Sequence, residues 1–136
     1  MNFQNHFFLY VEDDESSRTV MELMMHKVLK TKNYMFFSET TNFIERIKQL
    51  PVQPTIILLD IHMKPKDGFA LLDMLRADKD YERSKIIALT ASVMNEEIQQ
   101  LRRRGFDGAI GKPIKLTTFP YLIERIISGE SIWSVS

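Results

Sequence analysis

Acidic side chains follow two of the most apolar short segments of the chain. Phe7–Val11 is followed by Glu12 and Asp13, and Thr55–Leu59 is followed by Asp60. An unpaired carboxylate is costly to bury, so we expect these acids to emerge where each apolar segment ends. Clustered carboxylates repel one another and resist ionisation unless a cation neutralises them. The pattern therefore predicts a metal site, and Mg²⁺ suits it because Mg²⁺ binds through one or two carboxylates and keeps several waters.

A hydroxyl and an ammonium group follow two further apolar segments. Lys85–Leu89 ends at Thr90, and the weaker segment 107–111 ends at Lys112. Placed opposite a cation, these two groups complete a cradle for the oxygens of a phosphoryl group. Among the groups present, the Asp60 carboxylate is the preferred nucleophile, and its product is an aspartyl phosphate.

Strand and helix patterns alternate along the whole chain, which brings these groups together. The predicted strands are Phe7–Val11, Tyr34–Phe37, Thr55–Leu59, Lys85–Leu89 and 107–111. The predicted helices cover 15–30, Thr41–Leu50, Gly68–Ala77, a segment marked by Met94, Ile98 and Leu101, and a last segment from Phe119 to Ile127. Five strand–helix repeats predict right-handed βαβ units and an α/β fold with a doubly wound, five-stranded parallel sheet. The carboxyl ends of such strands lie on one edge, with neighbouring strands about 4.8 Å apart.

Length and composition restrict the function classes. At 136 residues the chain fits one domain, predicted over residues 1–128 with a tail over 129–136. Lys and Arg together number 18, as do Asp and Glu, so the overall charge indicates neither a nucleic acid nor a membrane partner. The absence of cysteine excludes disulfides and thiolate chemistry. No N-terminal apolar stretch is long enough for a signal peptide or a membrane span, and we expect a cytoplasmic protein.

Five short motifs resemble those of the receiver domains of bacterial two-component response regulators. They are LYVEDD (Leu9–Asp14), LLDIHM (Leu58–Met63), DG (Asp67-Gly68), ALTA (Ala88–Ala91) and KPI (Lys112–Ile114). The resemblance extends from Phe7 to about Ile127, with the motifs in the family's order and approximate spacing. It implies a flavodoxin-like sheet with strand order 2-1-3-4-5.

The resemblance also implies a role for each chemical residue. It makes Asp60 the phosphoacceptor and Asp13 a direct Mg²⁺ ligand, with Glu12 holding a metal-bound water and the His62 backbone carbonyl as a further ligand. It makes Thr90 the hydroxyl that follows the phosphoryl group and Lys112 the ammonium that contacts it. It further implies a cis peptide bond between Lys112 and Pro113.

The same resemblance implies a signalling switch rather than a turnover enzyme. Phosphate would come from a histidine kinase or a phosphotransfer protein. No effector domain follows the last predicted helix, so we expect a stand-alone regulator. Its output would be binding to a downstream protein through residues 90–127, including the exposed Arg102–Arg104, or binding to a second copy in a homodimer.

The chain departs from the family pattern at three positions. Lys64 is inserted before Pro65 in the loop after the acceptor, and His62 is larger and more titratable than is common there. Ala109, three positions before Lys112, replaces the Tyr or Phe that ordinarily moves inward on activation. The usual aromatic output switch is therefore absent at this position.

Other interpretations of these residues remain open. The chain could be a pseudo-receiver that serves only as an interaction module, although the complete set of acids, hydroxyl and lysine argues against it. It could also be a phosphatase with Asp60 as its nucleophile, but such an enzyme needs a second acid two residues later, where His62 stands. Arg102–Arg104 most often form a solvated face. Trp133 is expected to anchor a tail that is either loose or packed against the domain.

Overall fold

Five strands form one parallel sheet in the computed structural model, which describes residues 3–133. The strands are β1 (Phe8–Val11), β2 (Tyr34–Phe37), β3 (Ile56–Asp60), β4 (Lys85–Thr90) and β5 (Gly108–Gly111). Their order across the sheet is β2-β1-β3-β4-β5, and every pair is parallel. The predicted doubly wound fold and strand order are therefore confirmed.

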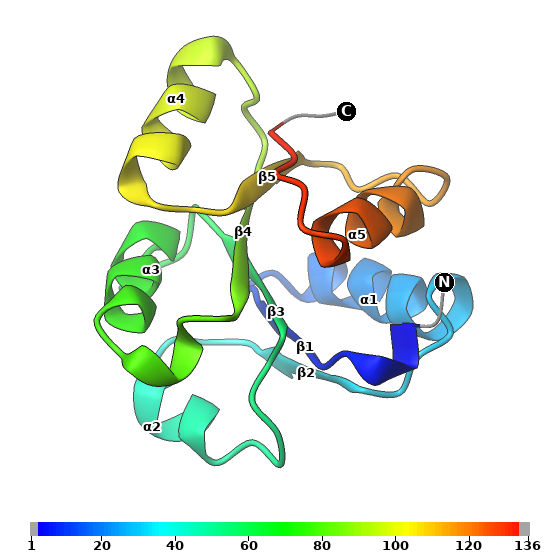
Figure 1. Ribbon diagram of the computed structural model, residues 1–136, viewed down its shortest axis with the longest axis horizontal. Helices are drawn as coiled ribbons and strands as arrows, with labels where there is room; N and C mark the ends of the chain where they lie inside the picture. Colours follow the sequence, from blue (N-terminus) through cyan, green and yellow to red (C-terminus); the bar gives the residue numbers. More distant parts are fainter. Residues whose placement is uncertain (1–2, 134–136) are drawn as a thin grey trace.

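Helices cover both faces of this sheet, as Figure 1 shows. They are α1 (Glu15–Leu23), α2 (Phe43–Lys48), α3 (Gly68–Arg76), α4 (Asn95–Arg104) and α5 (Phe119–Ile127). Short 3₁₀ turns cover Phe3–Asn5 and Lys79–Tyr81. One face carries α1 and α5, and the other carries α2, α3 and α4. Each face therefore has its own hydrophobic cluster against the central sheet.

Two helices are shorter than the sequence predicts. The helix expected over 15–30 ends as an α-helix at Leu23 and continues as a π-helical segment over Met24–Val28. The wider turn buries the side chains of both Met24 and Met25. In a regular α-helix, two consecutive side chains point in different directions around the axis. The second helix begins only at Phe43, because Asn42 has a left-handed backbone with φ of 52° and cannot be part of a right-handed helix.

The sheet interior explains the uninterrupted apolar runs in the sequence. All residues of β1 and β3 are buried, and so are five of the six residues of β4. A strand covered by helices on both faces has no solvent-facing side, so it lacks the alternation of a surface strand. The last described residues lie against the edge of β5, where the Ala109 N–H donates to the Ile132 carbonyl at 2.6 Å. The tail through residue 133 is thus packed rather than loose, and residues 134–136 lie outside the described part.

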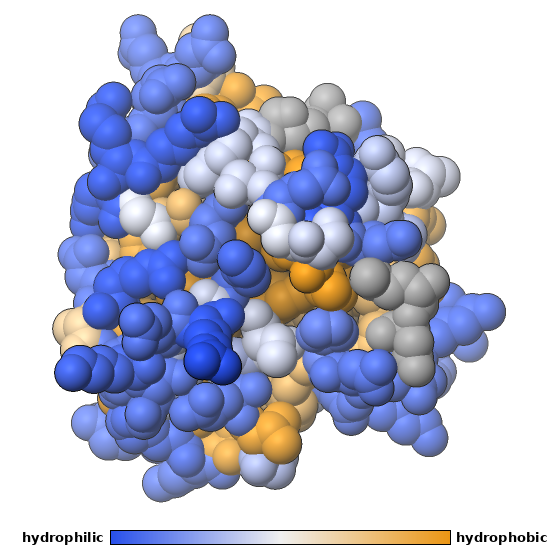
Figure 2. Space-filling view, viewed as in Figure 1, coloured by the Kyte–Doolittle hydropathy of each residue, from blue (hydrophilic) through white to orange (hydrophobic). Residues whose placement is uncertain are grey.

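The surface is mostly polar on the side of α3 and α4 and shows apolar atoms mainly between these helices and α5 (Figure 2). Within residues 3–133, no helix is long and apolar enough to cross a membrane.

Truncating a core leucine should test the packing of the sheet face under α3. Leu72 is fully buried in the cluster of α2, α3 and α4, whereas Leu23 on α1 is 47% exposed. We expect Leu72→Ala to lower the free energy of unfolding by about 2–5 kcal/mol in urea denaturation. The same change at Leu23 should alter it by less than about 0.5 kcal/mol. Equal losses in the two variants would contradict this packing.

Candidate functional site

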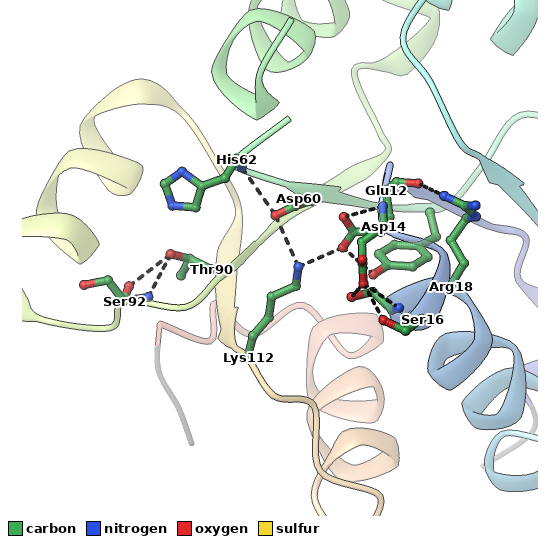
Figure 3. Close-up of polar contacts among 11 residues, drawn as sticks. Glu12, Asp14, Ser16, Arg18, Asp60, His62, Thr90, Ser92 and Lys112 are labelled. Carbon is green, nitrogen blue, oxygen red and sulfur yellow. Dashed lines mark hydrogen bonds and ion pairs between the residues drawn. The ribbon is translucent and has the colours of Figure 1, made fainter. Parts of the chain in front are cut away.

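The carboxyl ends of the strands bring the predicted site residues to one edge of the sheet (Figure 3). Glu12 directly follows β1, Asp60 ends β3, Thr90 ends β4 and Lys112 directly follows β5. The register is fixed by backbone pairing: Asp60 is opposite Leu89, and the next strand pair ends with Thr90 opposite Gly111. The positions of these side chains therefore follow from the parallel topology.

Three carboxylates form a tight acidic cluster. Each of Glu12, Asp13 and Asp60 offers an oxygen within 4.8 Å of the others. Glu12 and Asp60 are buried, while Asp13 is exposed at the mouth. Burial raises the pKa of Glu12, and the neighbouring Asp60 raises it further, against the opposing effects of Lys112 and Tyr10. A cluster of hard oxygen donors with one open side is the arrangement that suits a divalent cation such as Mg²⁺.

Lys112 supplies the positive charge inside this cluster. Its Nζ lies 2.7 Å from Glu12 Oε1 and 3.3 Å from Asp60 Oδ1, and its side chain is partly buried. Burial alone lowers the pKa of Lys112, but the hydrogen bond to Glu12 and the charge of Asp60 outweigh it, so the pKa is raised. The ammonium is therefore a permanent charge held between the two buried carboxylates.

Thr90 lies at the end of β4, but its hydroxyl contacts its own loop. Thr90 Oγ1 donates to the Ser92 carbonyl at 3.2 Å and accepts the Ser92 N–H at 3.1 Å. The residue is buried. These two bonds hold the start of the loop over 91–94, which leads into α4. In this state Thr90 therefore secures that loop.

The loop after Asp60 folds back tightly over the strand end. The backbone N–H of His62 donates to Asp60 Oδ1 at 3.3 Å, while the His62 side chain is exposed. Asp67 caps α3 by accepting the Ala70 N–H at 3.0 Å. A Cβ at Gly68 would lie 2.7 Å from the Asp60 carbonyl oxygen, so this close approach requires glycine. The Lys64–Pro65 and Lys112–Pro113 peptide bonds are both cis, the second as the resemblance implies.

Tyr10 is a site residue that the sequence reasoning missed. Its hydroxyl donates to Glu12 Oε1 at 2.9 Å, the same oxygen that accepts from Lys112. Burial raises the pKa of the Tyr10 phenol, and the Glu12 carboxylate raises it further, so the group stays a donor. The signal was available, because residues two apart on a strand face the same side.

Two more side chains fix the acidic segment from α1. Asp14 caps the helix by accepting from the Ser17 hydroxyl at 2.7 Å and from the Ser17 N–H at 2.8 Å, and these bonds, the hydroxyl first, lower the pKa of Asp14. The Arg18 guanidinium donates to the Glu12 carbonyl oxygen at 2.8 Å. The start of α1 therefore helps to fix the position of Glu12 at the end of β1.

An open cleft of about 500 Å³ adjoins Lys112. Its walls come from the start of α1, including Ser17 and Val20, and from the segment after β5, including Pro113 and Ile114. The cleft is mostly apolar, although it borders the charged cluster.

Comparison with known proteins agrees with this geometry. The family described as the response regulator receiver domain matches residues 8–124. This chain belongs to the response regulator receiver domain family. The receiver domain identified from the sequence motifs is thus confirmed.

Relatives of this receiver domain include much longer signalling proteins. Hybrid signal transduction histidine kinase A of Dictyostelium discoideum is 30% identical over 115 residues, which are 81% of this chain but 5% of the kinase. Stress response regulator protein 1 of Clavispora lusitaniae is 23% identical, covering 92% of this chain and 64% of the relative. This chain therefore spans a small share of the kinases and about two thirds of the smaller regulator.

Solved structures share the fold of this receiver domain. The chemotaxis response regulator CheY4 of Vibrio cholerae superimposes with a TM-score of 0.78 at 19% identity, covering 89% of this chain and 98% of that one. The receiver domain of sensor histidine kinase PA1611 from Pseudomonas aeruginosa, which holds a magnesium ion in its active-site cleft, gives 0.77 at 22% identity, with 91% and 98% coverage.

Replacing Lys112 should expose the charge conflict within the site. In Lys112→Met, Glu12 and Asp60 lose their ammonium partner, and we expect a loss of about 1–3 kcal/mol in the free energy of unfolding at neutral pH. Lys115→Met, three residues away at an exposed position, is the matched control and should change little.

The pH dependence of this loss has a definite sign. Without Lys112 the pKa of buried Glu12 rises further, so the folded state takes up a proton at a pH where the unfolded chain does not. Stability then falls as pH rises through the raised pKa. The deficit of Lys112→Met should shrink from about pH 7 to about pH 5 in denaturation series, because Glu12 becomes neutral in the fold. A constant deficit would argue against the charge explanation.

Proposed function

We propose that the chain is a phosphorylation switch that accepts a phosphoryl group on Asp60. The observation that carries this proposal is the position of the Asp60 carboxylate. It is buried at the end of β3, 3.3 Å from the Lys112 ammonium and within the three-carboxylate cluster. A carboxylate with a fixed cation beside it and a cation-binding cluster around it is built to receive a negatively charged phosphoryl group.

The transfer balances without a further reactant. A carboxylate oxygen of Asp60 forms a bond to phosphorus while the phosphorus–nitrogen bond of a phosphohistidine donor breaks; the leaving imidazole nitrogen keeps the bonding electron pair and takes up a proton from water. Lys112 balances the charge that develops on the phosphoryl oxygens. The Thr90 hydroxyl then turns from Ser92 toward the new oxygens.

Mg²⁺ is the cofactor that the donor set fits. Glu12, Asp13 and Asp60 would hold it, with the His62 carbonyl as the further ligand that the resemblance implies. Bound there, it would supply neutralisation of the acids and of the phosphoryl oxygens. The magnesium in the cleft of the PA1611 receiver domain supports this assignment.

The phosphoryl donor is a histidine kinase or a phosphotransfer protein, docked over the cleft beside Lys112. The support is the apolar character of the cleft and of α1, where Val20 is 45% and Leu23 is 47% exposed. Val20 lines the cleft beside Lys112 and Leu23 lies further along the same helix, so a protein seated on α1 and the cleft would hold its phosphohistidine near Asp60. The hybrid kinases among the relatives carry this family fused to a kinase, which agrees with such a donor.

The hypothesis that a downstream partner binds residues 90–127 needs one change, which concerns the residues that make the contact. Arg104 pairs with Asp73 at 3.1 Å, and Arg102 lies over the Trp133 ring, so these two arginines are engaged within the domain. The exposed large apolar side chains within residues 90–127 are Val93, Met94, Leu116 and Tyr121. We therefore assign the contact with a downstream partner, or with a second copy, to these residues rather than to the arginine run.

We assign no turnover chemistry, because His62 occupies the position where a phosphatase of this type needs an acid.

Phosphorylation of Asp60 is testable by intact mass. Incubation with acetyl phosphate and Mg²⁺ should add one phosphoryl group to the wild type, and chelation with EDTA should abolish the gain. Asp60→Asn should gain nothing, because an amide is not a nucleophile for this transfer. Asp67→Asn, which alters an exposed helix cap, is the control and should gain as the wild type does. An unchanged wild-type mass would sink the proposal.

Docking of the donor should be separable from the chemistry. We expect Val20→Lys to slow transfer from a phosphorylated phosphotransfer protein by about tenfold or more, since a buried apolar contact is worth about 1.5 kcal/mol or more. Its rate with acetyl phosphate should stay unchanged. Thr19→Lys, at the neighbouring exposed position, is the charge-matched control. Equal slowing with both donors would place the effect in the site and not in docking.

A further inference from the structure

The last described residues form an additional edge of the sheet. Gly129 has φ of 101° and turns the chain back after α5. The chain then runs beside β5, where the Ala109 N–H donates to the Ile132 carbonyl at 2.6 Å and Ala109 pairs with Trp133 in a parallel bridge. We call residues 129–133 the strap. Figure 1 shows it passing from α5 to the β5 edge.

The two apolar residues of the strap join opposite faces of the sheet. Ile132 is 4% exposed and belongs to the cluster under α1 and α5. Trp133 is partly buried and packs against the cluster under α2, α3 and α4. Successive residues of a strand point to opposite faces, so the strap closes both layers at the edge that β5 would otherwise leave open.

β5 is shaped to receive the strap. A Cβ at Gly108 would lie 2.7 Å from the Ile132 carbonyl oxygen and 3.3 Å from its nitrogen. Gly108 therefore allows the strap backbone to approach, and fully buried Ala109 leaves room for Trp133 opposite it. The small residue at position 109 thus has a use in the resting structure, as part of the seat of the strap.

Trp133 also ties the strap to α4. The Arg102 guanidinium lies 4.9 Å from the centroid of the indole ring, within the range of a cation–π contact. The buried side chains of α4 are Ile98 and Leu101. Arg104 also holds α4, by pairing with Asp73 at 3.1 Å, and the contact of Arg102 with Trp133 adds an attachment of α4 to the strap.

The other end of α4 connects to the site. The Thr90 hydroxyl makes two bonds with Ser92 that secure the loop before α4, and Met94 at the helix start provides no side-chain cap. A phosphoryl group on Asp60 would offer the hydroxyl charged acceptor oxygens, which bind more strongly than a neutral carbonyl. Turning Thr90 toward them breaks both bonds to Ser92 and frees the loop and helix to move.

We propose that the strap is a latch that holds α4 against β5 while Asp60 is unphosphorylated and releases Trp133 when Asp60 carries phosphate. The latch rests on the proposed function for its trigger. The latch would transmit the phosphorylation state of Asp60 to the surface next to β5. The aromatic side chain that moves is Trp133 of the strap, and not a residue of β5.

The chain carries its own probe for this latch, because Trp133 is its single tryptophan. Acrylamide quenching of indole fluorescence should rise by about twofold when the wild type is activated with beryllofluoride and Mg²⁺, as a partly buried ring becomes exposed. The emission maximum should shift to longer wavelength. Mg²⁺ alone, and Asp60→Asn with all additions, should leave both readings at the resting values.

Two substitutions test the seat of the strap without touching the acidic cluster. Gly108→Ala should raise quenching in the resting protein to the activated level, because its Cβ displaces the strap. Arg102→Gln should raise it partway by removing the cation from the ring. Arg103→Gln, the adjacent exposed arginine that lines a shallow cleft with Glu96 and Gln99, is the matched control and should behave as the wild type.

The outcomes separate the latch from the switch. A wild type that gains phosphate by intact mass but shows unchanged quenching overturns the latch and leaves the proposed function in place. A wild type that gains no phosphate overturns the proposed function and removes the trigger of the latch. Resting quenching unaltered by both Gly108→Ala and Arg102→Gln would show that the strap is not held by this seat.

Discussion

The charge balance between Lys112 and the carboxylates around it is the constraint on which the rest of the structure depends. Glu12 and Asp60 are both buried, and an uncompensated buried carboxylate is expensive. One ammonium cannot neutralise three acids, so the site keeps a net negative charge at its open side, where Asp13 lies. In the proposed function, this deficit would draw a cation to the edge, and the cation would in turn let a phosphoryl group approach. The proposed reactivity would therefore share its origin with the stability of the site.

The fold supplies this arrangement through strand ends rather than through a specialised loop. A parallel sheet places its carboxyl ends on one edge, so residues far apart in sequence meet without long-range loop ordering. Lys112 and Glu12 are 100 positions apart and lie within 2.7 Å. Tyr10 and Arg18 then fix Glu12 from the strand and from the first helix. The acid that contacts Lys112 is thus held from three directions.

The clustering of the acids could be predicted from periodicity and the parallel topology, whereas the strand order came only from the resemblance to receiver domains. The sequence did not predict the state of Thr90, because two bonds to the local backbone of Ser92 decide where the hydroxyl points. It did not predict the π-helical segment after Leu23, since the choice between α and π turns depends on how Met24 and Met25 pack. The sequence also did not predict the contact of Arg102 with Trp133. A run of arginines is typical of a solvated face, and only the tertiary packing shows that the Trp133 ring lies beside one of them.

The small side chain of Ala109 has a different meaning in the structure than in the sequence. In the sequence it is a departure that removes an aromatic ring from β5. In the structure the same position is fully buried, pairs with Trp133 and contributes its N–H to the strap. A bulky ring on β5 at this point would compete with the indole for the space between β5 and α4. The small pair Gly108 and Ala109 and the apolar pair Ile132 and Trp133 are therefore best understood together, as two halves of one contact that closes the open edge of the sheet.

This contact places the aromatic group on a segment with fewer backbone bonds than a central strand, and such segments open at lower free energy. The proposed latch therefore uses the element at this edge that has the fewest backbone bonds, and not the buried strands that hold Asp60.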